Sequence, residues 1–234
     1  MAHPPPRRAT LPSLASLDFH GASEYLEEFV ARIDLPTLCF ISVKLFNQIF
    51  FEIPQFRRFI CHLNALGSLE SPNKAIIEHT VESVSVCLYR EEKVQIPNSC
   101  GFRTSCRRFD WQLSFLTQIS SELFPLLPGI RSFTISQSGV LPTLEDVDST
   151  QWLDLFRLFT HVTEVAVCGH GLLPSVVQAL GAEEMSTEIL PELTSLFFNG
   201  YPEPLSDPGK IAAKQFVARR MSSSGRTVEL RGLF

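Results

Sequence analysis

The sequence predicts an α/β fold in which short strands and amphipathic helices alternate in one stack of repeats. Three observations support this prediction: a Leu-Pro strand pattern recurs along the chain, helical apolar spacing fills the intervals, and 44% of the 234 residues are apolar. The chain has 20 basic and 25 acidic residues, a formal net charge of −5. This acidic balance disfavours nucleic acid as a partner, because phosphate binding needs an excess of cations.

The recurring strand pattern reads Leu-Pro-x-apolar-x-x-apolar-x-apolar. Independent positions would produce it roughly 0.6 times in a chain of this composition. It occurs at residues 11–19, 35–43, 127–135 and 190–198. Its shorter apolar-x-x-apolar-x-apolar core also occurs at 81–86, 106–111 and 162–167, and Val228 and Leu230 fit an eighth unit. One interval of 43 residues is unusually long, and we expect it to hold an extra hairpin in which residues 74–79 pair with 83–89.

Amphipathic helices are predicted between the strands. Their apolar residues recur at i, i+3, i+4 and i+7, which is the spacing of one helix face. The predicted helices cover roughly residues 25–33, 56–63, 115–123, 152–159, 174–180 and 211–221. Pro54 precedes the second of these helices and suits a first helical turn, where its missing N–H group is not needed.

Neither the strand nor the helix of one unit can bury its apolar face alone, so the units are expected to stack. The predicted architecture is an irregular leucine-rich-repeat-like solenoid, with strand plus helix repeats of about 24 to 32 residues and a parallel concave sheet. A doubly wound α/β domain is the alternative, but that fold gives no reason for the Leu-Pro register to recur. Residues 11–234 are predicted to form one such domain, after a disordered Pro-rich tail at residues 1–10.

The N-terminus, the apolar runs and the cysteines together predict a cytoplasmic or nuclear protein. The N-terminus lacks the apolar stretch of a secretory signal, and no window approaches the ~20 apolar residues that a membrane helix needs. The six cysteines show no C-x-x-C motif and no repeated spacing, which is typical of reduced thiols. We therefore expect no membrane partner.

The sequence contains no recognisable catalytic motif. Neither a G-x-S-x-G nucleophile elbow nor a glycine-rich phosphate loop is present. The Cys-Gly-His triplet that starts at Cys168 is the best metal candidate, but it has no second ligand pair. Cys100 and Cys106 flank Arg103, so they are either packed thiols or thiolates of lowered pKa. We expect no catalytic, metal-binding or cofactor-binding residues, no cofactor and no enzymatic activity.

The predicted strands define a candidate binding face. Side chains alternate across a strand, so the residues between the apolar anchors point to the concave face. The predicted partner-binding residues on this face are Phe40, Ser42, Arg108, Asp110, Thr134, Glu164 and Phe197. Small polar residues with two aromatic anchors suit protein recognition better than a deep catalytic pocket. A flanking segment that covers Phe40 and Phe197 is the alternative interpretation.

Three segments resemble a known family. They are residues 11–34 (LPSLASLDFHGASEYLEEFVARID), 106–118 (CRRFDWQLSFLTQ) and 150–167 (TQWLDLFRLFTHVTEVAV). They are similar to the leucine-rich-repeat-like C-terminal region of mushroom-type (basidiomycete) fungal F-box domain-containing proteins, and the resemblance extends over about residues 11–230. It implies target recognition for a Skp1-cullin-F-box type ubiquitin ligase. The chain itself contains no recognisable F-box, so a Skp1-type adaptor is expected only where an F-box precedes these residues.

The predicted function is therefore a protein–protein interaction module that presents its concave sheet to a protein target. The first alternative is a free-standing or vestigial repeat protein that binds no adaptor. The second is a small α/β enzyme with an unrecognised site, which would require a deep pocket that collects titratable residues at strand ends. The sequence does not identify the target.

Overall fold

The computed structural model describes residues 8–46, 51–69, 71–91, 99–139, 149–169, 172–181, 189–199, 207–225 and 227–232. Most strands in these segments belong to one large sheet. In chain order these strands are β2 (Ser16–Gly21), β4 (Phe40–Leu45), β5 (Lys74–Thr80), β6 (Ser83–Tyr89), β7 (Ser99–Ser105), β8 (Ser132–Ser138), β9 (Glu164–Cys168), β10 (Ser195–Asn199) and β11 (Glu229–Arg231). The helices are α1 (Ser23–Arg32), α2 (Pro54–Ala65), α3 (Phe109–Glu122), the 3₁₀ helix η1 (Phe124–Gly129), α4 (Ser149–Phe156), α5 (Leu173–Gly181) and α6 (Asp207–Ser224).

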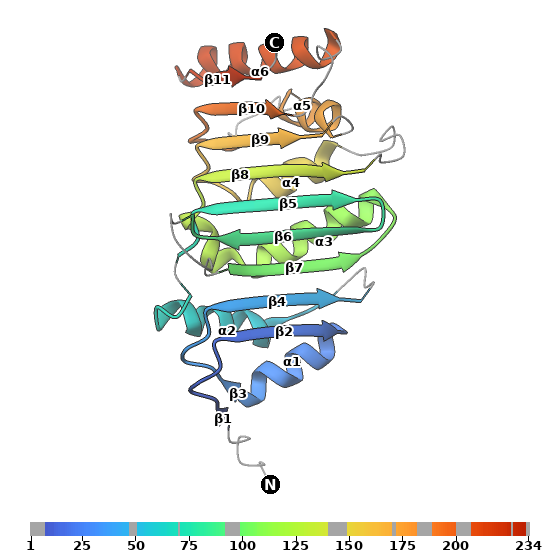
Figure 1. The fold of residues 1–234 in the computed structure, drawn as a ribbon. Coiled ribbons are helices and arrows are strands. Elements are labelled where there is room, and N and C mark those ends of the chain that lie inside the picture. The colour runs from blue at the N-terminus through green and yellow to red at the C-terminus, as the bar shows by residue number, and fades with distance from the viewer. Residues whose placement is uncertain are drawn as a thin grey trace.

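The nine-stranded sheet is mostly parallel and has the order β11-β10-β9-β8-β5-β6-β7-β4-β2. Only the pairs β5–β6 and β6–β7 are antiparallel among the strands of this sheet. Figure 1 shows α1 to α5 behind the sheet, whereas no described helix covers the face turned to the viewer. The predicted α/β class is confirmed in this form: a large, mostly parallel sheet with helices.

The long interval in the repeat holds the predicted hairpin. Residues of β5 pair antiparallel with residues of β6, from Lys74 opposite Tyr89 to His79 opposite Val84. The two strands alternate between buried and half-buried side chains over their whole length, which is why period-2 patterning identified them. β5 also pairs with β8, so the hairpin is inserted into the sheet rather than added at an edge.

The strand predicted at residues 106–111 is wrong. Residues 109–122 form α3, and the strand of this unit is β7, which lies just before it. Phe109, Leu113 and Leu116 are buried along one helix face at i, i+4 and i+7. Apolar residues at i and i+3 fit both the strand pattern and one face of a helix. The helical spacing continues along residues 109–122, so this segment folds as a helix.

A recurring hydrogen-bond arrangement joins parallel strands that are neighbours in the sheet, at the point where each strand begins. In each case one backbone carbonyl accepts hydrogen bonds from two consecutive N–H groups at the start of the neighbouring strand, at 2.8–3.1 Å. The acceptors are Ala15, Asn73, Arg131 and Thr163, and the respective donors are Cys39 and Phe40, Arg131 and Ser132, Thr163 and Glu164, and Thr194 and Ser195. In three of these junctions the first donor residue also donates its side-chain group to the same carbonyl, from Cys39, Thr163 and Thr194.

The core lies between the sheet and the helices behind it. Phe133 of β8 stacks on Phe159 with ring centroids 4.5 Å apart, and it meets Phe156 of α4 edge-on. Trp152 of α4 is fully buried beside Phe156. These aromatic contacts fix α4 against the sheet, because each buried ring removes a large apolar area from water.

One titratable side chain lies inside this core. His79, near the end of β5, is fully buried and packs against the rings of Phe109 and Trp152, which also contact each other. Burial disfavours the charged imidazolium and lowers the pKa of His79 to about 4. The side chain is therefore neutral at physiological pH.

The predicted N-terminal tail coincides only in part with described residues, since residues 1–7 lie outside them. Ala9 and Thr10 form β1 (Ala9–Thr10), which pairs in parallel with β3 (Ile33–Asp34) in a separate two-stranded sheet. This small sheet lies beyond β2, at the end of the stack opposite α6 (Figure 1).

Candidate functional site

The candidate site is the face of the large sheet that no described helix covers, which we call the open face. Strand register aligns one residue of each strand in a central row across it. In sheet order from β2 to β11 this row is Asp18, Ser42, Gly101, Cys87, Ile76, Thr134, Ala166, Phe197 and Arg231. Every member is half-buried or exposed, whereas the alternate residues of the same strands are mostly buried. The row is thus accessible to a partner.

Five of the seven predicted partner-binding residues lie on the open face. Ser42, Thr134 and Phe197 belong to the central row, and Phe40 and Glu164 lie two residues before it on β4 and β9. Phe197 is 38% exposed, and Phe40 is half-buried. The strand prediction placed these side chains correctly because the apolar anchors beside them are buried.

The other two predicted residues, Arg108 and Asp110, lie off the sheet. Arg108 is the N-cap residue of α3, and Asp110 lies in the first turn of that helix. The Arg108 guanidinium donates from Nε and Nη2 to the two Asp110 carboxylate oxygens, at 3.1 and 2.7 Å. Their placement on the binding face was wrong because residues 109–122 are helical. An acidic group in the first turn suits the positive end of the helix dipole instead.

The strand that was missed contributes Gly101 and Arg103 to the open face. β7 reads Ser-Cys-Gly-Phe-Arg-Thr-Ser, with Cys100, Phe102 and Thr104 buried on the helix side. This alternation is a period-2 signal, but its buried set contains only one large apolar side chain. The signal was therefore weaker than the helical pattern that follows it.

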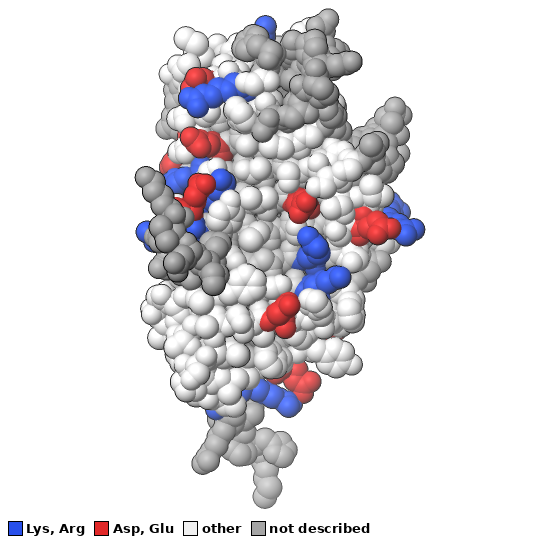
Figure 2. Space-filling model, viewed as in Figure 1, with Lys and Arg blue, Asp and Glu red and all other residues white. Residues whose placement is uncertain are grey.

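A first depression on the open face, the Lys44 depression, has a volume of about 380 Å³ and lies over β2, β4, β7 and β6. Its lining includes the side chains of His20, Phe40, Lys44, Cys87 and Arg103 and the backbone of Gly101. Figure 2 shows the charged residues of this face in small groups that contain both signs, on a mostly uncharged surface.

A second depression, the Phe197 depression, has a volume of about 260 Å³ and lies over β5, β8, β9, β10 and β11. Thr134, Glu164 and Phe197 line it together with Lys74 and Arg231. Arg231 forms an ion pair with Glu229 at 2.6 Å, and this hydrogen bond lowers the pKa of the Glu229 carboxyl. The structure therefore brings three of the predicted residues together around one hollow.

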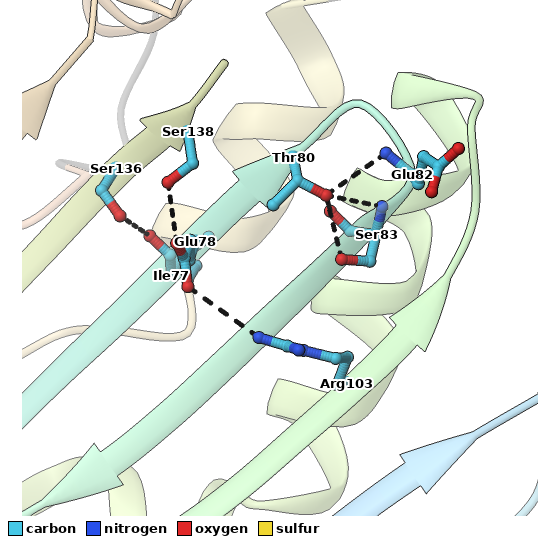
Figure 3. A network of polar contacts seen from close by, with 8 residues as sticks. All are labelled: Ile77, Glu78, Thr80, Glu82, Ser83, Arg103, Ser136 and Ser138. Atoms are coloured by element: carbon cyan, nitrogen blue, oxygen red, sulfur yellow. Dashed lines mark hydrogen bonds and ion pairs between the residues drawn. The ribbon is translucent and has the colours of Figure 1, made fainter.

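Polar contacts connect the middle strands between the two depressions (Figure 3). Ser138 on β8 donates to Glu78 Oε1 on β5 at 2.8 Å, and Arg103 Nη2 on β7 lies 4.0 Å from Glu78 Oε2. Ser136 of β8 donates to the backbone carbonyl of Ile77 at 3.1 Å. At the hairpin turn, Thr80 Oγ1 accepts from the Ser83 N–H at 2.9 Å. These contacts hold polar side chains in place along the open face.

The thiolate interpretation of the cysteines is wrong. Cys100 is buried on the helix side of β7, and desolvation raises the pKa of its thiol far above the usual value. Burial also raises the pKa of Cys106, which follows β7, and of Cys168 at the end of β9. His170 of the metal candidate lies outside the described residues. Among the residues that the structure describes, no three His, Cys, Asp or Glu side chains are grouped so that they could hold a metal ion.

Comparisons with known proteins add no identification. No protein-family profile, no curated protein and no solved structure matches the chain significantly. In the part of the chain with described coordinates, no helix is both long and apolar enough to cross a membrane.

Proposed function

We propose that this protein is a protein–protein interaction module whose open face binds the partner. The observation that carries the proposal is that no described helix covers this face of the sheet (Figure 1). Mostly parallel sheets normally have both faces covered, because crossover helices lie on each side. Here α1 to α5 lie behind the sheet, and a nine-residue row on the other face is accessible (Figure 1).

We propose further that the units form an irregular leucine-rich-repeat-like solenoid. The recurring junctions support this, because one carbonyl accepts the same pair of N–H bonds from the neighbouring parallel strand at Ala15, Asn73, Arg131 and Thr163. Thr163 and Thr194 even repeat the same hydroxyl contact. Repeat proteins of this kind use the extended surface of their sheet for binding.

The partner, in this proposal, is a target of a Skp1-cullin-F-box type ubiquitin ligase. The support is the resemblance of residues 11–34, 106–118 and 150–167 to fungal F-box proteins. In such receptors a separate F-box holds the Skp1-type adaptor, so the open face is available for the target. A cytoplasmic or nuclear location follows from the same assignment.

The test begins with a photo-crosslinking amino acid at Thr134 on the open face and, in a matched variant, at Arg58 on the exposed side of α2. We expect a protein that is crosslinked from position 134 and not from position 58. That protein is then purified and titrated against the Thr134→Arg and Arg58→Glu variants. Loss of binding only in the first variant supports the proposal, and equal binding by both variants contradicts it.

The ligase assignment has a separate readout. When the gene is deleted, the crosslinked partner should accumulate, because an uncaptured target is not degraded. An unchanged partner half-life would remove the ubiquitin part of the proposal and would leave the open-face interaction intact.

A further inference from the structure

We propose that the Lys44 depression binds an oxyanion, a carboxylate or a phosphate, that is carried on an extended segment of the partner protein. The inference rests on the proposed function, because it assigns part of the partner's chemistry to one place on the open face.

The first argument is the alignment of like charges. Lys44 on β4 and Arg103 on β7 are direct cross-strand partners on the same face, and His20 on β2 is the neighbour of Lys44 on its other side. Adjacent strands are only about 4.8 Å apart, and like charges directly opposite each other destabilise a sheet. A bound anion between Lys44 and Arg103 would turn this repulsion into attraction.

The second argument is that neighbouring acids leave hydrogen-bond donors of Lys44 and Arg103 free, although Asp18 lies 3.3 Å from His20 and Glu78 forms a long ion pair with Arg103. Within the described segments, Lys44 has no ion-pair partner. Arg103 approaches Glu78 only at 4.0 Å, and its side chain is 51% exposed. A guanidinium offers five N–H donors in a planar fork that suits carboxylate and phosphate oxygens. Donors are therefore available to an incoming group.

The third argument is Gly101, which lies in the central row between Ser42 and Cys87. A Cβ atom at this position would come no closer than 3.9 Å to Cys87 Sγ and the Ile41 carbonyl, an ordinary contact distance. The backbone of Gly101 is also outside the left-handed region. The fold therefore does not require glycine at this position, and glycine weakens the interior of a strand. A glycine in a strand often marks the close approach of a ligand or another chain, which is the role that we assign to Gly101.

The size of the depression fits a side chain together with its adjoining backbone rather than an ion alone. Its volume is about 380 Å³, and Phe40 forms an apolar part of its lining beside the cations. An extended acidic peptide would fit both the cationic and the apolar part of the lining. Its oxyanion would contact Lys44 and Arg103, and an aliphatic segment would pack against Phe40.

The test is a fluorescence-polarisation titration of the full chain with three labelled octapeptides that differ only in their central residue. The centre is glutamate, phosphoserine or glutamine, flanked by the same valine, serine and threonine residues in all three peptides. We expect the two charged peptides to bind about tenfold more tightly than the glutamine peptide, and to lose this advantage when salt rises from about 50 mM to about 500 mM. Tighter binding of the phosphoserine peptide assigns a phosphate, and the reverse order assigns a carboxylate; either order supports the site.

Three variants locate the binding. The Lys44→Gln and Arg103→Gln substitutions together should reduce binding of the charged peptides to that of the glutamine peptide. Arg58→Gln on α2 removes the same kind of charge elsewhere and should change nothing. Gly101→Val should weaken the charged peptides without lowering the thermal midpoint, because it fills the depression and suits a strand.

Two results would overturn the proposal: equal or absent binding of all three peptides, or charged-peptide binding that persists in the double variant. The crosslinked partner separates this outcome from failure of the open-face function. If Thr134→Arg abolishes partner binding whereas the double variant retains it fully, the oxyanion site is wrong and the open-face interaction stands.

Discussion

His79 Nδ1 lies 3.0 Å from Gln112 Oε1 in the buried layer between the β5–β6 hairpin and α3. The Gln112 amide nitrogen donates to the carbonyls of Thr80 and Cys106, at 3.0 and 2.7 Å. Gln112 Oε1 is therefore the acceptor toward His79, whose neutral ring carries its proton on Nδ1. One buried glutamine thus links the hairpin, the end of β7 and α3.

Protonation of His79 should destabilise the fold at acidic pH. The pKa is about 4 in the folded protein and about 6.5 in an unfolded chain, so the unfolded state binds the proton first as pH falls. The stability that the neutral ring contributes is complete above pH 6.5 and is lost between pH 6.5 and 4, by about 3 kcal/mol. Urea unfolding across this range measures it. In His79→Gln the free energy of unfolding should fall by about 3 kcal/mol less between pH 6.5 and 4 than in the parent protein. An equal fall in both proteins would contradict the role of His79.

Removing the Gln112 side chain should be strongly destabilising. Gln112→Ala removes three hydrogen bonds, one from His79 Nδ1–H and two to the carbonyls of Thr80 and Cys106. Each buried group that loses its partner costs about 1–3 kcal/mol. We expect a loss of about 3 kcal/mol in the free energy of unfolding, measured by urea denaturation. Ser121→Ala on the exposed side of α3 is the control and should stay within about 0.5 kcal/mol of the parent.

The threonine hydroxyls at the junctions should each contribute modestly. Thr163→Val keeps the shape of the side chain and removes the 3.1 Å bond from Oγ1 to the Arg131 carbonyl, which should lower the unfolding free energy by about 1 kcal/mol. Thr160→Val is the matched control, because its exposed hydroxyl has no hydrogen-bond partner within the described chain. Equal midpoints in chemical denaturation for both variants would show that the junction hydroxyl does not contribute.

The cysteines should differ sharply in reactivity. Cys61 on α2 is exposed, whereas Cys100 is buried and the pKa of its thiol is raised by desolvation. Thiolates are the reactive species, so an aromatic disulfide reagent should modify Cys61 quickly and Cys100 only after denaturant is added. Mass spectrometry of the labelled peptides identifies the sites, and Cys61→Ser should remove the fast phase. Rapid labelling of Cys100 in the native protein would contradict its burial.

The sequence could predict the elements whose apolar pattern has a single interpretation. Residues 74–79 and 83–89 alternate strictly, and their predicted pairing in a hairpin is confirmed by β5 and β6. The apolar anchors of β2, β4, β8, β9 and β10 were equally clear, and these strands placed Ser42, Thr134 and Phe197 on one face. Apolar periodicity is a local property, and burial of one face suffices to enforce it.

The same reasoning failed where one pattern fits two periods. Residues 106–111 fit the strand core and also begin a helix face, so Arg108 and Asp110 were assigned to the sheet although they belong to the start of α3. The sequence around β7 carries only one large buried apolar residue, Phe102, and gave too little contrast to correct the assignment.

By itself, the sequence determined the alternation of strands and helices, because each element must bury its own apolar residues. Only the tertiary structure decided which strands are neighbours. The antiparallel β6 between β5 and β7 sets the register that aligns Cys87 with Gly101 and Ile76, and the pairing of β4 with β7 places Lys44 beside Arg103. Periodicity determines which face of a strand is buried, but the choice of a neighbouring strand depends on segments far apart in the chain, such as β4 with β7 and β5 with β8.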